Sequence, residues 1–269
     1  MRELFQPYLR LWDLEPEGEP FATDFSWLCP VRRGAEPALL KVLKPASDEG
    51  RGADLLAWYD GKGAVRLLRA AERALLMERA HGRRQSLSAM APAGNDRQAA
   101  EILSATMLSL LAPRSAPPPQ GLESLEQRFA PLLRATDAAL QRAAASARAL
   151  LAAPLDRVVL HGDLHHENVI DGGARGWLAI DPKGMLGERS YEAANILCNP
   201  AAAGTFVQRP ERFRWQARHF GDSLAVPPER VLAFALAHAG LAVCWSLEDG
   251  TDPAHWRACT ALLEGLQER

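Results

Sequence analysis

The feature that most limits the fold of this 269-residue chain is a change of pattern near residue 81. In residues 21–80 the apolar residues come in short runs separated by turn-forming residues, which is typical of an antiparallel sheet. After His81 and Gly82 they recur at helical spacing in long stretches rich in alanine and leucine. The sequence therefore predicts an α+β protein with a small, sheet-based N-terminal lobe and a larger, mainly helical C-terminal lobe.

The N-terminal lobe is predicted in the order strand, strand, helix, strand, strand. A turn that contains Gly34 separates two apolar runs, so these form a hairpin. Ser47, Asp48 and Glu49 supply N-cap chemistry for the helix. The predicted elements are strands at 27–31, 38–43, 64–68 and 74–78 and a helix from Ser47 to about Tyr59.

The C-terminal lobe is predicted to hold long helices on both sides of a group of short strands. The expected elements are helices at 96–111 and 122–152, strands at 155–160, 168–170 and 177–180, and helices beyond about residue 190. Residues 231–247 form a charge-free run of 17 residues, just short of a membrane span. We expect this run to be a buried core helix.

Composition and charge exclude several classes of protein. Lys and Arg number 31 against 33 Asp and Glu, so the chain lacks the basic surplus of a nucleic-acid-binding protein. The four cysteines are far apart, which argues against a disulfide framework or a zinc knuckle. Charges and prolines interrupt the N-terminus, unlike a signal peptide. We expect a cytoplasmic protein that binds neither nucleic acid nor membrane.

The residues that can carry chemistry gather between His161 and Gly184, in the segment HGDLHHENVIDGGARGWLAIDPKG. Asp163 follows one apolar strand, Asn168 comes five residues later, and Asp181 ends another apolar strand. A hairpin around the glycines at 172–173 would place Asn168 and Asp181 side by side, as a hard cation such as Mg²⁺ requires. Asp163 could then accept a proton from a substrate hydroxyl group.

This spacing of Asp163, Asn168 and Asp181 is that of the catalytic loop and metal aspartate of protein-kinase-like phosphotransferases. The HGD opening resembles the aminoglycoside phosphotransferase branch, and the string LHGDLHHENV…GWLAIDPKG is similar to streptomycin kinases and hydroxyurea phosphotransferases. The resemblance implies a protein-kinase-like two-lobe fold. It also implies an ATP- and Mg²⁺-dependent kinase that phosphorylates a hydroxyl group of a streptomycin-like aminoglycoside, with Asp163 catalytic and Asn168 and Asp181 on the metal.

The resemblance further implies a lysine on the third strand that binds the nucleotide phosphates and pairs with a helix acid. Lys41 lies in the alternating apolar run ALLKVLK, and we favour it over Lys44, which precedes a proline at the strand exit. Glu49 is the favoured acidic partner and Asp54 the alternative. By itself, Glu49 is equally explained as a carboxylate favoured at a helix N-terminus.

Other nucleotide contacts are implied in the N-terminal lobe and in the segment that joins the lobes. The region before the lysine strand has a single glycine instead of a glycine-rich loop, so Thr23 and Ser26 become the phosphate-loop candidates. Backbone groups of Glu78, Arg79 and Ala80 would bind adenine. The implied division is an N-lobe over 1–77 that binds nucleotide, a linker over 78–82, and a C-lobe over 83–269 with the catalytic loop and the acceptor site.

Other residues of the segment allow more than one role. His161 is expected to brace the loop by hydrogen bonds, whereas Lys183 could bind a phosphate oxygen or an acidic residue. One alternative is a metal-dependent hydrolase that uses His161, Asp163, His165 and His166, because these residues have ligand-like density. Another is an inactive kinase-like module that binds nucleotide. The remaining histidines are expected to be structural: His81, His219, His238 and His255.

A cationic acceptor requires carboxylates near the catalytic loop. Glu188 and Glu192 follow the metal aspartate, and Glu248 and Asp249 end the long apolar run, while Trp245 could stack on a guanidinium group. Each of these acids could equally be an ordinary solvated carboxylate. The sequence therefore proposes them as acceptor-binding candidates without choosing among them.

Overall fold

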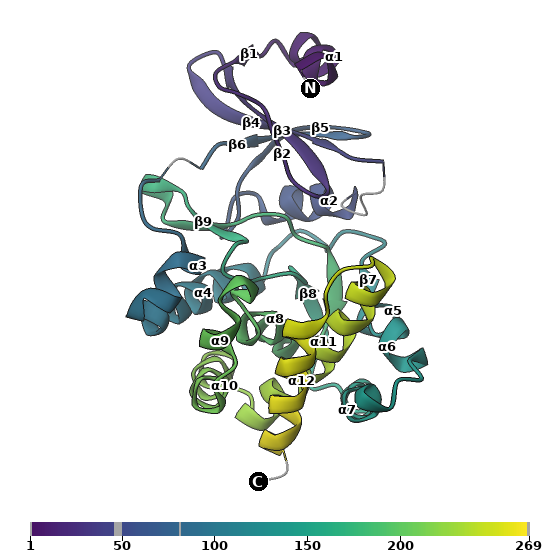
Figure 1. Ribbon diagram of the computed structural model, residues 1–269. Coiled ribbons are helices and arrows are strands. Elements are labelled where there is room, and N and C mark those ends of the chain that lie inside the picture. Colours follow the sequence, from purple (N-terminus) through teal and green to yellow (C-terminus); the bar gives the residue numbers. More distant parts are fainter. Residues whose placement is uncertain (1, 46–49, 81, 268–269) are drawn as a thin grey trace.

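The structure, a computed structural model, describes residues 2–45, 50–80 and 82–267. An antiparallel sheet with helix α1 on its outer side forms one end of the molecule, and most of the helices form the other (Figure 1). The hairpin that ends at the predicted metal aspartate lies between the two (Figure 1). This arrangement is the one expected from the change of pattern near residue 81.

The strands are β1 (Glu15–Pro16), β2 (Phe21–Ala22), β3 (Ser26–Arg33), β4 (Glu36–Leu43), β5 (Leu67–Ala71), β6 (Ala74–Glu78), β7 (Glu123–Ser124), β8 (Val158–Leu160), β9 (Val169–Asp171), β10 (Trp177–Ala179) and β11 (Met185–Gly187). The helices are α1 (Arg2–Trp12), α2 (Gly50–Tyr59), α3 (Leu87–Met90), α4 (Asp96–Leu111), α5 (Leu125–Arg128), α6 (Ala130–Arg134), α7 (Gln141–Ala152), α8 (Ala194–Leu197), α9 (Gly204–Val207), α10 (Pro210–Leu224), α11 (Pro228–Glu248) and α12 (Ala254–Gln267).

The N-terminal sheet has the order β1-β3-β4-β6-β5, with β2 paired to β3. The predicted hairpin is present as β3 and β4, in which Lys41 lies opposite Leu28. The strand expected at 64–68 was misplaced, since β5 covers Leu67–Ala71. The reason is that Ala64 forms a bridge with Ala179, and Val65 donates its N–H to the Ala179 carbonyl oxygen at 3.0 Å.

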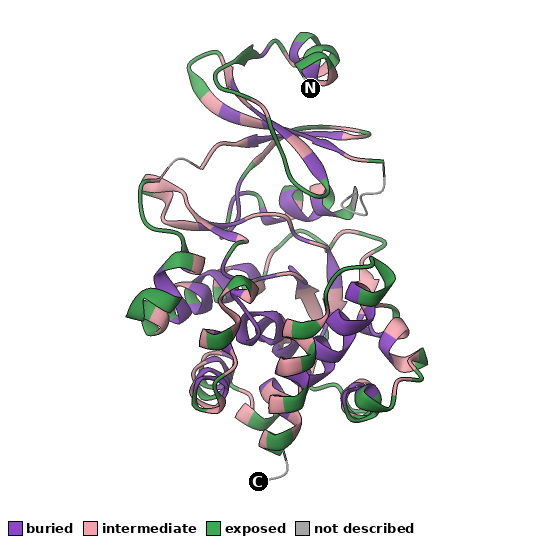
Figure 2. Cartoon of the chain, in the orientation of Figure 1, coloured by how far each residue is buried: buried purple, intermediate pink, exposed green. Residues whose placement is uncertain are grey.

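Helix α1 is an element that the sequence analysis missed, because the prolines and charges of this segment mask its period. Phe5 and Leu9 are its buried residues, and they pack with Cys29, Val31 and other residues of the sheet in a separate small core. The main core lies among the helices of the other lobe (Figure 2). Helix α1 therefore covers the face of the sheet that points away from the predicted active site.

The centre of the larger lobe is α11, which packs against α7, α10 and α12. Among the described residues it is the one helix long and apolar enough to cross a membrane, and 72% of its most apolar window is buried inside the protein. The expectation of a buried core helix at 231–247 is thus confirmed. Its apolar residues serve the core, as the purple turns of Figure 2 show.

The long helix expected at 122–152 was wrong in its continuity. The structure divides this stretch into β7, α5, α6 and α7. Ser124 and Gln127 form a capping box that starts α5, Pro131 lies in the first turn of α6, and Asp137 caps the turn before α7. These capping hydrogen bonds and the proline end one helix and begin the next. The helical spacing of apolar residues continues across the breaks, which is why the sequence predicts a single helix.

The hairpin of β9 and β10 joins the two lobes. Its register pairs Asp171 with Trp177, as the predicted turn at the glycines requires. The chain that enters the larger lobe passes close over Asp171: Gly82 donates its N–H to the Asp171 carbonyl oxygen at 3.0 Å, and a Cβ on Gly82 would lie 1.8 Å from the Asp171 carboxyl carbon. Only glycine fits at this crossing.

Helix α2 makes a second close contact, with the segment that follows the metal aspartate. A Cβ added to Gly52 would lie 2.7 Å from the Pro182 carbonyl oxygen, closer than real Cβ atoms approach. The absence of a side chain at Gly52 therefore lets α2 pack directly on the segment after Asp181.

We predict that Gly52→Ala lowers the melting temperature, because relief of this overlap costs about 1–3 kcal/mol and exceeds the gain in helix propensity of about 1 kcal/mol. Gly265→Ala is the matched control: it lies in α12 with no atom within 4 Å of the added Cβ, so it should raise the melting temperature. Differential scanning calorimetry measures both. A Gly52→Ala protein as stable as the Gly265→Ala protein would contradict the close packing of α2.

Candidate active site

Asp163 lies in the loop after β8, with each carboxylate oxygen bound by an amide. Oδ1 accepts from Asn195 Nδ2 at 2.9 Å and Oδ2 from Asn168 Nδ2 at 3.2 Å. Asn168 Nδ2 also donates to the Asp163 carbonyl oxygen at 2.8 Å. Burial raises the pKa of Asp163, while the charges of His165, Lys183 and Arg128 oppose the rise. The side chain keeps 29% of its surface exposed, so a substrate hydroxyl can reach it.

His161 braces this loop as expected. Its Nε2 donates to the Ile180 carbonyl oxygen at 2.8 Å, and its Nδ1 accepts the Asp163 backbone N–H at 3.2 Å. Burial lowers the pKa of His161 to about 4, so the ring is neutral and keeps one donor and one acceptor nitrogen. The His161 carbonyl oxygen also accepts the Lys183 N–H at 2.8 Å. The ring thus ties the Asp163 loop to the segment around Asp181.

Lys41 and Asp181 meet across the two lobes. Lys41 Nζ lies 2.7 Å from Asp181 Oδ1, although the residues are 140 positions apart. The Lys41 side chain is 3% exposed and that of Asp181 is 34% exposed. Lys44 instead donates to the Thr23 carbonyl oxygen at 2.6 Å. The structure therefore brings Lys41, and not Lys44, to the predicted metal aspartate.

Asn168 and Asp181 lie at the same end of the β9–β10 hairpin. The expected register is corrected by one residue: Ile180 N–H donates to the Asn168 carbonyl oxygen at 2.9 Å, so Asn168 is opposite Ile180. Asp181 has a left-handed backbone with a φ of 57°, which turns the chain out of the strand. Carboxylate and amide oxygens are the donors that Mg²⁺ prefers, so the donor set fits this ion.

The turn between β2 and β3 contains both phosphate-loop candidates. Thr23 Oγ1 and Ser26 Oγ are 3.1 Å apart, and the Thr23 N–H donates to the Ser26 carbonyl oxygen at 2.9 Å. Phe25, between them, is 50% exposed, and Lys183 Nζ lies 5.4 Å from the centre of its ring. The turn therefore reaches across to the segment after Asp181, with Lys183 at the point of contact.

The segment between the lobes contains Glu78, Arg79 and Ala80. The Glu78 carboxylate accepts from Arg175 and from the Arg66 N–H, and Arg79 Nη2 lies 2.6 Å from Glu17 Oε2. These contacts use side chains and hold the segment at the edge of the sheet. They do not involve Ala80.

Two acceptor-binding candidates are corrected by the structure. Glu188 is 1% exposed, and its carboxylate binds Arg230 at 2.5 Å and Ser190 Oγ at 2.8 Å. Glu192, in a short 3₁₀ helix over Arg189–Ala193, is 2% exposed and accepts the Gly162 N–H at 3.2 Å. Both side chains are buried in the interior of the lobe, so neither faces a substrate.

Glu192 is unusual because its Oε2 is buried with no hydrogen-bond partner among the described residues. Burial raises its pKa to about 8, while hydrogen bonds to the backbone of Gly162 and His161 oppose the rise. The carboxyl group is therefore protonated at neutral pH. Glu192 therefore holds the catalytic loop through the Gly162 N–H as a neutral group.

The other acceptor candidates lie at the end of α11. Trp245 is partly buried, and the Arg128 guanidinium carbon lies 4.7 Å from the centre of its ring. The expected stacking partner of Trp245 is thus a cation of the protein itself. Glu248 and Asp249 are exposed, one turn further along the chain.

The hydrolase alternative has no support in the structure. Within residues 2–45, 50–80 and 82–267, no group of three or more His, Cys, Asp or Glu side chains could hold a metal ion. His161 bonds backbone groups, and His166 is buried with neither ring nitrogen bonded to a described group. His165 Nε2 lies 3.9 Å from Asp163 Oδ1.

The helix acid that pairs with Lys41 is not identified by the structure. Glu49 lies outside the described residues. Asp54, the alternative, is exposed on α2. Glu49 therefore stays a prediction.

Three residues that act on Asp163 directly or through a neighbour were missed by the sequence analysis: Asn195, Arg128 and His238. Each lies outside residues 161–184, and none stands in a recognisable motif. His238 carried the one usable signal, since it is the single histidine in the charge-free run of α11. That signal was interpreted as structural.

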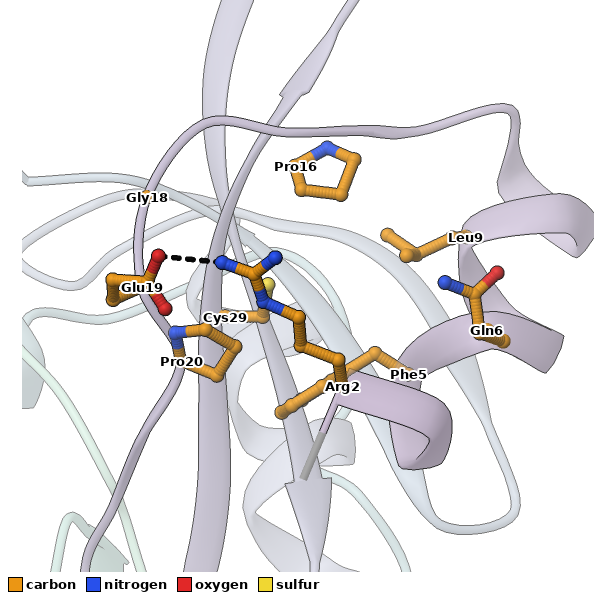
Figure 3. A pocket seen from close by; sticks show the side chains of 9 residues that line it. All are labelled: Arg2, Phe5, Gln6, Leu9, Pro16, Gly18, Glu19, Pro20 and Cys29. Atoms are coloured by element: carbon orange, nitrogen blue, oxygen red, sulfur yellow. Dashed lines mark hydrogen bonds and ion pairs between the residues drawn. The ribbon is translucent and has the colours of Figure 1, made fainter.

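A separate hollow lies on the far side of the sheet, between α1 and residues 16–20 (Figure 3). Its volume is about 450 Å³, and Arg2 and Glu19 form a 2.5 Å ion pair at its edge (Figure 3). Cys29 lies in its wall, and burial raises the pKa of this thiol. No predicted catalytic residue lines it, so phosphoryl transfer does not belong there.

The chain is similar to a known protein family and to several known proteins. The family model described as aminoglycoside/hydroxyurea antibiotic resistance kinase matches residues 11–250. Streptomycin 3''-kinase of Klebsiella pneumoniae is 44% identical over 96% of this chain and 98% of its own length. Hydroxyurea phosphotransferase of Kitasatospora aureofaciens is 32% identical over 90% of this chain and 72% of its own length.

A solved structure shows the same fold at lower identity. Aminoglycoside phosphotransferase APH(4)-Ia has a TM-score of 0.71 and 16% identity, with 98% of each chain covered. A thermostable mutant of that protein is known in a ternary complex with ADP and hygromycin B. The predicted protein-kinase-like, two-lobe α+β fold is therefore confirmed.

We predict that Glu192 makes the stability of the protein depend on pH. Its pKa rises from 4.5 to about 8 on folding, so its contribution to stability is complete below about pH 4.5 and is lost as the pH rises to 8. Glu192→Gln keeps the neutral shape and removes this dependence. Urea unfolding between pH 5 and 8 should show the wild type losing stability relative to the variant.

Glu211→Gln, an exposed carboxylate on α10, controls for the change from carboxylate to amide. A constant difference between wild type and Glu192→Gln across pH 5 to 8 would show that Glu192 is already ionised in the folded protein.

Proposed function

The chain belongs to the family of aminoglycoside/hydroxyurea antibiotic resistance kinases, and from this we propose that it uses ATP and Mg²⁺ to phosphorylate a hydroxyl group of a streptomycin-like aminoglycoside. The observation that carries the proposal is the geometry around Asp163. A partly exposed carboxylate, held through both oxygens, lies close enough to Asp181, the partner of Lys41, for the two carboxylates to interact electrostatically. This arrangement suits a hydroxyl acceptor on one side and a nucleotide phosphate on the other.

In the proposed mechanism, Asp163 orients the acceptor hydroxyl and takes its proton as the oxygen bonds to the γ-phosphorus atom of ATP. The bond between the γ-phosphorus and the oxygen that bridges to the β-phosphate breaks at the same time, and ADP leaves. Lys41 binds the α- and β-phosphates. Asn168 and Asp181 would hold Mg²⁺, which neutralises phosphate charge when it is bound. Because the transition state for phosphoryl transfer is loose, most of the rate comes from position and charge.

We propose that nucleotide binds between residues 1–77 and 83–269, with adenine against the backbone of Glu78, Arg79 and Ala80. The side chains of Glu78 and Arg79 are held by ion pairs at the sheet edge, which supports a backbone role for the segment 78–82. Thr23 and Ser26 are proposed at the phosphates. Lys183 would join them there, because its ammonium group already lies beside Phe25 in the turn between them.

The proposed acceptor site lies beyond Asp163, on the side of Arg128 and Trp245. Arg128 acts electrostatically on Asp163 and stacks on Trp245. The positive charge of Arg128 would repel a cationic group of the acceptor, so the hydroxyl-bearing parts of the acceptor are expected beside Arg128. Its cationic groups are expected further out, at Glu248 and Asp249. We propose a cytoplasmic enzyme with no nucleic acid or membrane partner.

Streptomycin should be phosphorylated faster than hydroxyurea, because streptomycin carries cationic groups that Glu248 and Asp249 can bind. The double variant Glu248→Gln plus Asp249→Asn should raise KM for streptomycin roughly two- to tenfold, the effect of one or two exposed ion pairs. Its kcat should stay within about twofold of wild type, since these contacts are the same in ground and transition states. A coupled assay of ADP release measures both constants.

Glu211→Gln plus Asp222→Asn removes two exposed acids on α10 and should leave KM unchanged. An unchanged KM in the first double variant would remove the end of α11 from the acceptor site. Faster turnover of hydroxyurea would reverse the choice of acceptor.

A further inference from the structure

A line of buried polar side chains leads from Asp163 into the larger lobe. Asn195 Nδ2 donates to Asp163 Oδ1 at 2.9 Å, and Asn195 Oδ1 lies 3.0 Å from His238 Nε2. His238 Nδ1 lies 3.2 Å from the Tyr191 hydroxyl group. These side chains come from α8, α11 and the 3₁₀ helix before α8. Burying so many polar atoms is costly unless they bond one another.

The hydrogen bonds of this line run in one direction. The side-chain oxygen of Asn195 can only accept, so His238 Nε2 carries the hydrogen. Burial lowers the pKa of His238 to about 3, which keeps the ring neutral and leaves Nδ1 as an acceptor for Tyr191. Burial also raises the pKa of Tyr191 to about 12, so its hydroxyl keeps its hydrogen. Every donor therefore points toward the Asp163 carboxylate.

The surroundings prevent the line from rearranging. The His238 ring packs edge-on against Tyr191, Trp245 and Trp256 at centroid distances of 5.8, 6.0 and 6.0 Å. Asn199 Nδ2 also donates to Asn195 Oδ1 at 2.8 Å. If the Asn195 amide were flipped, its NH₂ group would face two other donors, His238 Nε2 and Asn199 Nδ2. These contacts therefore fix the orientation of the amide.

We propose that Asn195 and His238 are positioning residues that fix the rotation of the Asp163 carboxylate for attack by the acceptor hydroxyl. Asn168 binds Oδ2 from within the same loop, and Asn195 binds Oδ1 from a different element. With both oxygens anchored by the protein, the remaining lone pairs of the carboxylate are left on its exposed side. This inference rests on the proposed phosphotransferase function.

The test measures kcat, KM for ATP and KM for streptomycin in four variants, together with their melting temperatures. His238→Phe keeps the ring shape, and Asn195 Oδ1 keeps its donor from Asn199. We expect kcat to fall about 10- to 100-fold, the cost of a misplaced catalytic group, with KM for ATP within threefold of wild type. Asn195→Ala should lose at least as much, and His238→Gln, which restores a donor toward Asn195, should recover most of kcat.

His255→Phe is the matched control, because His255 bonds the Cys198 carbonyl oxygen at 2.8 Å in the same helical region. It should change the melting temperature and leave kcat within twofold.

The inference is overturned if His238→Phe keeps kcat within twofold, if His238→Gln falls as far as His238→Phe, or if His255→Phe loses kcat equally. If Asn195→Ala does not fold, the two His238 variants decide. A wild type that transfers no phosphate defeats the proposed function as well, whereas an active wild type with unaffected variants defeats this inference alone.

Discussion

The ion pair of Lys41 and Asp181 is the contact on which the candidate site depends. A lysine that is 3% exposed must have a partner, because a buried ammonium group without one is strongly destabilising. The β4 strand places Lys41 opposite Leu28 and Leu75, and Asp181 reaches it from the end of the β9–β10 hairpin. The left-handed turn at Asp181 allows this approach. This ion pair is one of the contacts that set the position of the β9–β10 hairpin relative to the sheet.

Several close contacts hold the hairpin in that position. Gly52 lets α2 lie on Pro182, Gly82 lets the linker cross Asp171, and Ala64 pairs with Ala179. His161 and Glu192 then support the catalytic loop from inside, both as neutral groups at neutral pH. Because His161 and Glu192 are neutral, the negative charge of the site is carried by Asp163 and Asp181. Asp163 is proposed to take the acceptor proton, and Asp181 is proposed to hold the cation.

Residues close together in sequence were the ones that the sequence could predict. The spacing of Asp163, Asn168 and Asp181 indicated a shared site, and the alternation around Lys41 indicated a strand, because both depend on local geometry. Asn195 and His238 were missed because they reach Asp163 only through the packing of α8 and α11. Glu188 and Glu192 were misjudged for the same reason. A carboxylate in a sequence gives no sign that it is buried, and only the tertiary structure shows Arg230 beside Glu188 and the Gly162 N–H beside Glu192.

The central claim is that Asp163 acts on the acceptor while the nucleotide binds beside the Lys41–Asp181 pair. It is tested most directly by following phosphate transfer from ATP to streptomycin by mass spectrometry in wild type and Asp163→Asn. The variant should form the phosphorylated product at least about 100-fold more slowly, the usual effect of losing a general base, while Mg²⁺ with a non-hydrolysable ATP analogue still raises its melting temperature. Retention of more than about a tenth of the wild-type rate would contradict the claim.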